Sequence, residues 1–544
     1  LGSPDSSMRW QAAHCVRRLS EFSCNAEIDQ LISWMQKGEV EAFAGRNLPF
    51  YELHARLYLL IALLRASIDD TTFLKPHAEI FKKIALQDMP HVLIQRYAAD
   101  IALNIEKKYP RTYTTKIIER LQHVGQSPFR VKIEKYSTKL KHKNASWNTK
   151  NIKVNKNPAL YFGIDFEPYW VAPLANIFNA PLVQTSELIS KIVTNEFKIN
   201  ESLNYRDPRY NQYTYKDVQH SHGRYPYVDD YKFYYSYHGL LSGAARLIGK
   251  MPIVCSSNDA YERSKWNRWL KLHSLTHCNG KWLADRRDPS PIQRRQWINE
   301  SLNDNWSCSI NREDFLDCLT RHDSFPKSLC VFGYWKDHHG YFEETIRISS
   351  ALVSPLTSQA LANALRSCKD PLRYRLPYYL DHEHEYNKPP FELQGWIAHE
   401  EDCDSGLDNF DPYAKEIPYP PFTVGKSIET LFKLKSHNDC RTWYLPNSQK
   451  PSLRSELWSD KDIDERRDEG PYRFGNRMNA SILFLKELCR QLDKELIIEV
   501  QIERQHYDFG RKNYEFGYVP PSHKIFIFSS KGVLKDAERS HTIG

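Results

Sequence analysis

The strongest constraint in this sequence is the helical spacing of apolar residues in its first quarter. Apolar positions recur three and four residues apart in 10–19, 53–66, 78–86 and 91–105, a pattern typical of amphipathic helices. The segments 10–19, 55–66 and 94–105 resemble one another at a spacing of roughly 40 residues, the period of HEAT-like helical pairs. We therefore expect a mainly α-helical HEAT-like repeat domain over 4–130, with an irregular helical domain as the alternative.

Composition and length describe an ordinary globular protein. The chain has 544 residues, of which 41% are hydrophobic and 26% charged, and this length suggests two to four domains. The net charge of +8 permits a nucleic-acid partner without demanding one. None of the 11 cysteines forms a CxxC pair, so free thiols in a reducing compartment fit best. No signal peptide is visible and the longest apolar run, 57–64, is too short to cross a bilayer, so we expect a cytoplasmic location and no membrane partner.

The first residues indicate a piece of a larger protein. Residues 1–3, Leu-Gly-Ser, resemble the scar that a tag-removing protease leaves, and a helical pattern begins almost at once after them. We expect further domains to precede residue 4 in the full protein.

Residues 131–158 form a basic segment that we interpret as a linker between domains. It carries a single acid, Glu134, and the aromatic residues Tyr136 and Trp147. Its lysines are Lys132, Lys135, Lys139, Lys141, Lys143, Lys150, Lys153 and Lys156. Cations for phosphates interleaved with rings for stacking are also what a nucleic-acid groove needs, so nucleic-acid binding through this strip is the alternative.

A mixed, mainly helical and aromatic-rich domain is expected over 159–370. A helix carrying Tyr234, His238, Leu241 and Ala245 follows a dense tyrosine cluster at 205–237. Exposed tyrosines give large contact area at a low entropic cost, so the candidate ligand-binding residues are Tyr213, Tyr215, Tyr225 and Tyr227. Arg286 and Arg287 alternate with acids before Pro289, which fits an internal ion-pair network or a forked arginine site for a carboxylate or phosphate.

A loop-rich α+β domain is expected over 371–544. The sequence predicts a helix over 478–492, strands over 495–502 and 524–528, and a turn over 529–532. Helix plus antiparallel strands favours a small α+β unit at the C-terminus.

Motifs for catalysis are incomplete. The sequence contains no phosphate-binding loop, no G-x-S-x-G elbow and no H-E-x-x-H. His382 and His384 could hold a metal ion with a third ligand such as His399, but neighbouring prolines favour an exposed loop. Glu499 and Gln501 on a predicted strand are faintly similar to the acid-x-lysine end of a nuclease core, with glutamine in place of lysine.

Several sequence segments together resemble a known family. These segments are 9–19, 220–226, 234–239, 282–289 and 496–502. The chain resembles the C-terminal, repeat-bearing region of bacterial STAND-type, NACHT-like NTPases associated with antiphage defence. The resemblance implies an N-terminal effector and a central NTPase outside this chain, and a C-terminal part that senses a trigger, often a phage protein. The resemblance does not imply which residues of this chain would bind the ligand.

These observations favour a sensor. We expect a ligand-sensing, protein-interaction module that binds a trigger protein and relieves the autoinhibition of a missing NTPase domain, with no cofactor and no catalysis in this fragment. The alternatives are a nucleic-acid-binding module and a metal-dependent hydrolase or nuclease.

Overall fold

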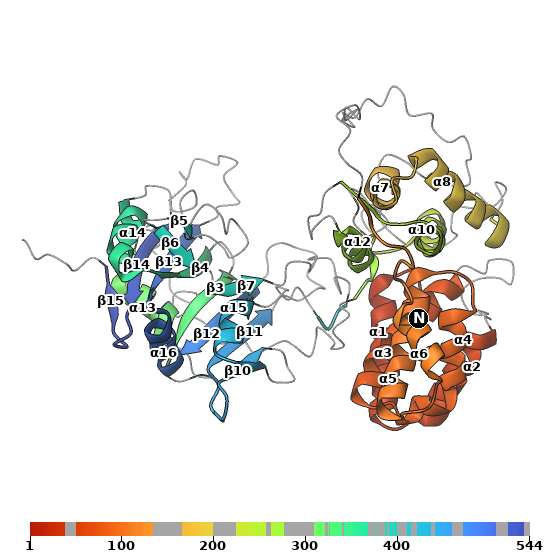
Figure 1. Cartoon of the computed structure of the whole chain (residues 1–544), viewed down its shortest axis with the longest axis horizontal. Coiled ribbons are helices and arrows are strands. Elements are labelled where there is room, and N and C mark those ends of the chain that lie inside the picture. Colours follow the sequence, from red (N-terminus) through yellow and green to blue (C-terminus); the bar gives the residue numbers. More distant parts are fainter. Residues whose placement is uncertain are drawn as a thin grey trace, which may run out of the picture. The chain divides into compact units, whose positions relative to one another are not determined.

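The chain forms two compact units in a computed structural model (Figure 1). Unit 1 comprises Leu1–Trp282 with Gly406–Pro412, and unit 2 comprises Leu283–Ser405 with Tyr413–Gly544. The structure describes residues 1–37, 51–133, 166–199, 223, 225–256, 263–276, 309–320, 325, 327–339, 342–367, 376, 387–388, 391–394, 396–399, 411–414, 422–436, 441–459, 472–506 and 521–537. The expected boundaries at 130, 158 and 370 divide the chain differently from these two units.

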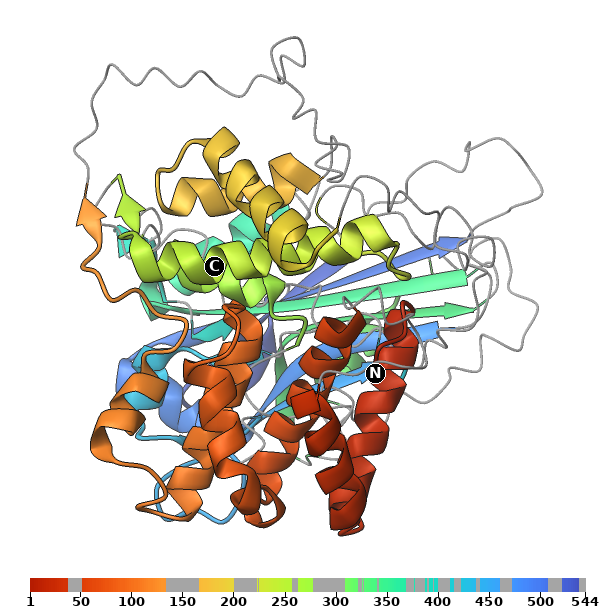
Figure 2. The same cartoon turned by 90° about the vertical axis from the view of Figure 1, so that its right-hand side faces the viewer.

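Unit 1 is helical in its described part. Its first helices are α1 (Ser6–Glu21), α2 (Asn25–Lys37), α3 (Tyr51–Asp69), a 3-10 helix (Thr72–His77), α4 (Ala78–Leu86), α5 (Val92–Lys108) and α6 (Thr115–Gln122). They are followed by a π-helical turn (Glu167–Val171), α7 (Ala172–Ile177), α8 (Leu182–Lys191), a second π-helical turn (Ile192–Glu196), α10 (Tyr231–Lys250) and α12 (Lys265–His273). Two short strands, β1 (Lys132–Ile133) and β2 (Val254–Cys255), pair in parallel. Figure 2 shows the red-to-orange helices of the first 130 residues lying side by side.

The helices begin where the sequence supplies caps. The Asp5 carboxylate accepts hydrogen bonds from the backbone of Ser7 and Met8 at the start of α1, and the Asp230 carboxylate accepts one from Phe233 at the start of α10. Such caps satisfy amides that have no partner within the helix. The helical patterns at 10–19, 53–66, 78–86 and 91–105 are confirmed, as is the helix carrying Tyr234 and His238, whereas the arrangement as HEAT-like repeats stays a prediction.

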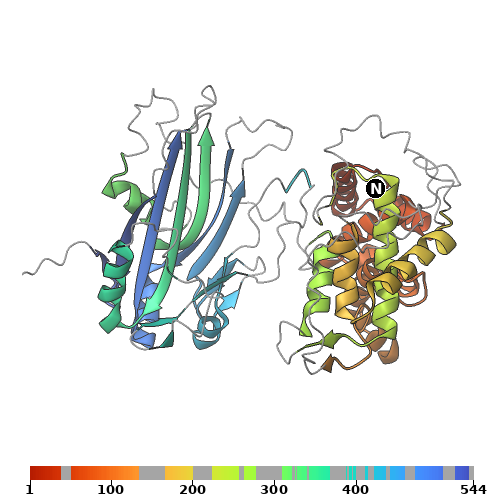
Figure 3. The same ribbon diagram turned by 90° about the horizontal axis from the view of Figure 1, so that it is seen from above.

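Unit 2 is built on one antiparallel sheet. Its main path runs β15-β14-β13-β4-β3-β12-β11-β10-β9, with β6 paired to β4 and β5 paired to β6. These strands are β3 (Ser328–His339), β4 (Phe342–Val353), β5 (Asn387–Lys388), β6 (Phe391–Gln394), β9 (Lys435–Ser436), β10 (Thr442–Tyr444), β11 (Leu453–Ser459), β12 (Tyr472–Ser481), β13 (Glu495–His506), β14 (Ser522–Phe528) and β15 (Leu534–Asp536). A separate pair consists of β7 (Ile397–His399) and β8 (Phe422–Val424). Figure 3 shows the long strands side by side.

Four helices accompany this sheet in the described part of unit 2. They are α13 (Arg312–Thr320), α14 (Pro355–Ser367), α15 (Lys426–Leu431) and α16 (Ile482–Leu492). Because successive side chains of a strand point to opposite faces, β13 contributes to two cores. Ile498 shares an apolar cluster with Phe315 of α13, whereas Ile497 lies in a second cluster with Leu361 of α14.

The layout of a helical part followed by an α+β part is confirmed. The strands expected at 495–502 and 524–528 are present. The helix expected over 478–492 begins only at Ile482, because Met478 to Ser481 continue strand β12 in register with β3. The long strands β3 and β4 lie inside the stretch 159–370 that was expected to be mainly helical. No described helix combines the length and the apolar character needed to cross a membrane.

Candidate functional site

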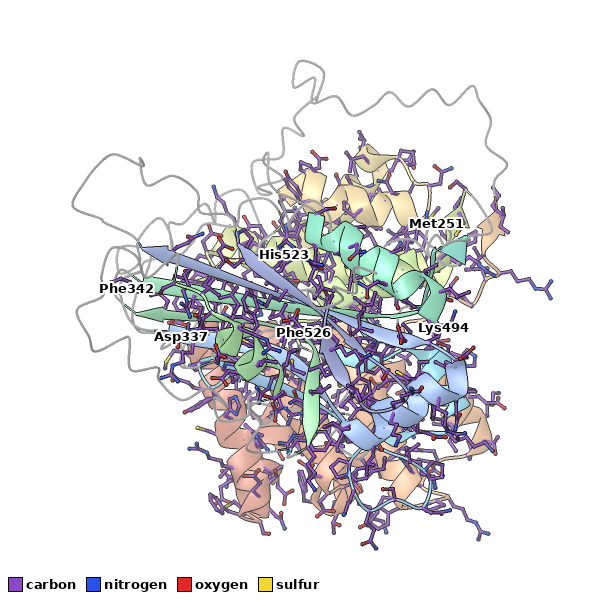
Figure 4. All side chains as sticks on the ribbon, turned by 90° about the vertical axis from the view of Figure 1, so that its left-hand side faces the viewer. Met251, Asp337, Phe342, Lys494, His523 and Phe526 are labelled. Atoms are coloured by element: carbon purple, nitrogen blue, oxygen red, sulfur yellow. The ribbon has the colours of Figure 1, made fainter. Side chains whose placement is uncertain are left out.

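A row of polar side chains crosses five neighbouring strands of the sheet in unit 2. The register places Asn476 of β12 opposite Tyr334 of β3, Tyr334 opposite Arg347 of β4, Arg347 opposite Gln501 of β13, and Gln501 opposite His523 of β14. Residues directly opposite in an antiparallel pair share a face, so all five side chains lie on one side. Figure 4 shows His523 between the end of the sheet marked by Asp337 and Phe342 and the end marked by Lys494.

A second row runs beside the first on the same face. It contains Phe474, Lys336, Thr345 and Glu503 in mutual register. We call the two rows together the polar face. Another part of this side of the sheet packs on an apolar layer, since Ile497 lies in one cluster with Leu361 of α14. One side of an antiparallel sheet is often polar, but Thr345 and Gln501 of the polar face are buried, which is unusual for polar side chains.

Two aromatic rings and a guanidinium form the centre of the polar face. The ring centroids of Tyr334 and Phe474 are 6.1 Å apart with a tilt of 56°. The Arg347 guanidinium carbon lies 5.4 Å from the centroid of the Tyr334 ring, within the range of a cation–π interaction. The side chain of Arg347 remains 39% exposed, so this centre is accessible.

Each cation of the polar face already has a carboxylate partner. Arg347 Nη1 lies 3.5 Å from Glu503 Oε2, and Lys336 Nζ lies 2.7 Å from Glu343 Oε1. A phosphate would therefore compete with a carboxylate at both positions, which weakens the attraction of this face for a polyanion.

Three buried oxygens on the same face have no hydrogen-bond partner among the residues that the structure describes. They are the Oγ atoms of Ser455 and Ser459 and the Oδ1 atom of Asn476, in residues that are at most 6% exposed. Ser459 lies opposite Phe474 and Asn476 lies opposite Tyr334, so these two residues adjoin the aromatic centre. Ser455 lies further along β11, opposite Met478. A buried oxygen left unpaired costs about 1–3 kcal/mol, and such a group calls for an explanation.

The opposite side of β11 and β12 carries a buried ion pair. Arg477 Nε lies 2.7 Å from Glu456 Oε2, and Asn479 Nδ2 donates to the same oxygen at 3.0 Å. Arg477 Nη2 and Asn479 Oδ1 have no hydrogen-bond partner in the described part of the chain. Cys330 lies opposite Asn479, and burial raises the pKa of its thiol to about 12. The thiol is therefore not an available nucleophile at neutral pH.

The structure places Glu499 on the face of the polar row, next to Gln501. The Glu499 carboxylate accepts a hydrogen bond from the Gln501 amide at 3.1 Å and one from the Leu376 backbone at 3.3 Å. Ser349, rather than an acid, lies opposite Glu499 on β4. Within the described residues no group of three or more His, Cys, Asp or Glu side chains could hold a metal ion. Metal-dependent hydrolysis stays a prediction.

Two of the tyrosines proposed for ligand binding are half-buried in unit 1 and have partners there. The Tyr225 hydroxyl lies 3.1 Å from His273 Nδ1, and its ring meets Trp170 edge to face at 4.7 Å. Burial raises the pKa of Tyr225 well above its usual value. The Tyr227 hydroxyl donates to Ser7 Oγ at 3.0 Å. Packing accounts for both side chains, and their role in binding stays a prediction.

The other residues proposed from the sequence fall mostly outside the described part of the chain. Lys132 is described: it is exposed on β1, and its backbone donates to Ile253. The remaining candidates outside the described residues are Tyr213, Tyr215, Arg286, Arg287, Lys135, Lys139, Lys141, Lys143, Trp147, His382 and His384. The structure therefore brings none of these sets together within the described residues.

Sequence reasoning did not single out the centre of the polar face. Tyr334 and Arg347 belong to strands whose polar and apolar residues alternate only in part. That alternation was a usable signal for strands, but it does not indicate which residues become neighbours.

Comparisons with known proteins add no assignment. No protein-family model matches the chain, and a search of curated proteins finds no match.

Proposed function

We propose that this chain is a protein-recognition module of a larger protein and that the polar face of unit 2 is its contact surface. The observation that supports this proposal most is that the buried oxygens of Ser459 and Asn476 have no hydrogen-bond partner among the described residues and lie opposite the partly exposed rings of Phe474 and Tyr334. Unsatisfied polar groups weaken a fold, and they are tolerated where function needs them. A polar partner whose donors reach these oxygens would supply the missing hydrogen bonds.

The residue types at the centre favour a protein partner. Tyrosine, phenylalanine and arginine are enriched at protein interfaces, and arginine and tyrosine dominate their hot spots. Tyr334, Phe474 and Arg347 stand together on the polar face. The pairing of Arg347 with Glu503 and of Lys336 with Glu343 favours a partner with charges of both signs over a nucleic acid.

The resemblance to STAND-type defence NTPases gives this proposal its biological setting. In that setting the partner is a trigger protein, such as a phage protein, and the missing NTPase domain is the responder. Ligand binding relieves autoinhibition only if the trigger binds the active arrangement more tightly than the resting one. We also propose that the protein is cytoplasmic and that this chain catalyses no reaction itself.

Hydrogen exchange of the full chain tests the proposal. The chain is mixed with individually purified candidate triggers, and exchange is compared with that of the free chain. A true trigger slows exchange in β3, β4 and β12 around Tyr334, Arg347 and Asn476. Binding that protects only other segments, or no binding by proteins that activate the full-length protein, rules out the polar face.

A pair of arginine variants sharpens the test. Arg347→Ala removes a central interface residue and should weaken trigger binding by about 30-fold or more, as expected for a hot spot. Arg490→Ala is the matched control, because Arg490 is an exposed arginine paired with Glu487 on α16. Equal binding by both variants would contradict the assignment.

Nucleic-acid binding through the lysines beginning at Lys132 is the second candidate. The exposed position of Lys132 on β1 is compatible with it. Gel shifts with single-stranded DNA and RNA at rising salt test it, since contact with phosphates makes affinity fall steeply with salt.

A further inference from the structure

A chain of buried histidines runs through unit 1. His54 Nε2 contacts Asp229 Oδ2, His54 Nδ1 lies 3.1 Å from His238 Nε2, and His238 Nδ1 lies 3.0 Å from His91 Nε2. The chain ends at the start of α5, where His91 Nδ1 accepts the backbone N–H of Ile94 at 3.3 Å. We call these four side chains, Asp229, His54, His238 and His91, the histidine relay. His54 belongs to α3, His91 caps α5 and His238 belongs to α10, while Asp229 directly precedes the N-cap of α10. The relay therefore connects these three helices.

The hydrogen positions in the relay follow from its two ends. The Asp229 carboxylate, held 3.1 Å from the Arg9 guanidinium, can only accept, so His54 Nε2 must carry a hydrogen. At the other end the Ile94 N–H donates to His91 Nδ1, so the hydrogen of neutral His91 is on Nε2. His238 then accepts at Nδ1 and donates from Nε2 to His54. Both ends give the same assignment: all three imidazoles are neutral with the hydrogen on Nε2.

This assignment leaves no ring nitrogen free to take a proton. Each imidazole donates from one nitrogen and accepts at the other. An added proton must therefore bind an Nδ1 atom that already accepts a hydrogen bond. On His54 or His238 it would then face the N–H of the neighbouring histidine, and on His91 it would face the Ile94 N–H. Protonation of any one of the three rings thus breaks one contact of the relay.

The surroundings oppose proton uptake as well. Burial lowers the pKa of His54, with Arg9 as a further cause, and burial lowers the pKa of His91 to about 3, with Arg56 adding to it. Burial also lowers the pKa of His238, and the neighbouring histidines add to the effect.

The groups that face the relay come from several elements. They are Arg9 on α1, Tyr58 and Arg56 on α3, Asp229 before α10, and Tyr234 and Tyr237 on α10. The carboxylate among these groups, Asp229, is neutralised by Arg9.

The relay also fastens the N-terminal segment. The Asp229 backbone donates to the carbonyl of Pro4 at 2.9 Å, and Arg9 Nη1 donates to the carbonyls of Ser3 and Pro4 at 2.7 and 2.9 Å. The Ser6 backbone donates to Tyr227 at 3.0 Å. Asp229 thus connects the histidines on one side with residues 3–9 on the other.

We propose that the histidine relay is an acid-sensitive latch that holds the N-terminal segment and the start of α5 against α10 and that opens when it takes up one proton. This proposal goes beyond the recognition function and does not depend on it. Opening should increase about tenfold for each pH unit below the ordinary histidine pKa of about 6.5, because one proton is taken up per opening event.

Hydrogen exchange of the full chain, corrected for intrinsic rates, tests the latch between about pH 7.5 and about pH 5.5, which brackets the ordinary pKa. Exchange should accelerate in residues 5–9, 91–95 and 231–238, while β4 and β13 in unit 2 stay protected. Equal acceleration in both units, or no acceleration near Ile94, overturns the proposal.

Two further measurements separate a latch from simple destabilisation. His91→Asn keeps a good helix cap and removes the ring whose protonation displaces the Ile94 N–H. Acid should therefore accelerate exchange at 91–95 less in this variant than in His77→Asn, a matched control whose histidine pairs with Asp29 outside the relay. Selective nitrogen-15 labelling of histidine should show all three relay rings with the hydrogen on Nε2 at neutral pH. An unchanged acid response in His91→Asn, or any relay ring with its hydrogen on Nδ1, excludes the latch.

Discussion

Gly475 of β12 lies directly opposite Trp335 of β3, and no side chain larger than hydrogen fits between them. A methyl group on Gly475 would overlap the Cβ of Trp335 and lie 2.6 Å from Cζ2 of Trp458. Both indoles are buried. This glycine is therefore required by the packing of two tryptophans across adjacent strands.

Gly475→Ala should destabilise unit 2 by about 2 kcal/mol or more, because overpacking forces the backbone or the indoles to move. Denaturant unfolding followed by tryptophan fluorescence measures the loss. Gly333→Ala is the graded comparison, since its nearest neighbours lie at 3.0 Å and its cost should be smaller. Wild-type stability in Gly475→Ala would contradict this packing.

Two glycines of α10 should respond oppositely to the same substitution. A Cβ on Gly239 would lie 2.7 Å from Val193 Cγ2, whereas a Cβ on Gly249 would meet nothing within 4 Å. Gly239→Ala should therefore lower the melting temperature. Gly249→Ala should raise stability by up to about 1 kcal/mol, since alanine favours the helix. Calorimetry of both variants decides the sign.

Acid should weaken unit 1 through its buried histidines. Burial lowers the pKa of His54, His91, His238 and His273 in the folded state, to about 3 for His91 and His273. Because the unfolded chain takes up protons near pH 6.5 and the folded chain does not, stability is complete above that value and falls as the pH drops below it. Each histidine should cost about 1 kcal/mol at about pH 5.5. Denaturant titrations at several pH values measure this slope, and a flat profile between about pH 7 and about pH 5 would contradict it.

The polar groups of β11 should divide into two classes. Glu456→Ala leaves the buried Arg477 guanidinium without its carboxylate and should cost about 3–5 kcal/mol. Ser459→Ala removes a buried hydroxyl that has no hydrogen-bond partner within the described residues and should leave stability unchanged or raise it by about 1 kcal/mol. Thermal unfolding of both variants tests the contrast. A large loss in Ser459→Ala would show that its hydroxyl supports the fold rather than recognition.

Local sequence predicted the helices of unit 1 well, because an amphipathic helix is specified by residues three and four apart. The same reasoning extended α16 backwards over Met478, since the residues that hold β12 as a strand lie in β3, more than a hundred positions earlier. Pairing between distant strands decides such segments, and propensity does not encode it.

The polar face escaped prediction for a related reason. Arg347 and Gln501 come from distant parts of the chain and become neighbours only through the register of β4 with β13. No periodicity within one strand indicates that Tyr334 will stand beside Asn476. The sequence could indicate the strands but not their order, and the order creates the site.

The contact between His14 and Asp411 has a practical consequence for dissecting this protein. His14 Nε2 lies 2.8 Å from the Asp411 carboxylate, which is fully buried, although residues 283–405 of unit 2 come between the two parts of unit 1 that carry these residues. A fragment ending at Trp282 would lack Asp411, so His14 of α1 would lose this buried partner. Because unit 1 consists of two separate stretches, no contiguous fragment contains all of it without residues of unit 2. A fragment of unit 1 that keeps the contact between His14 and Asp411 therefore needs residues 406–412 joined to residues 1–282 by a linker.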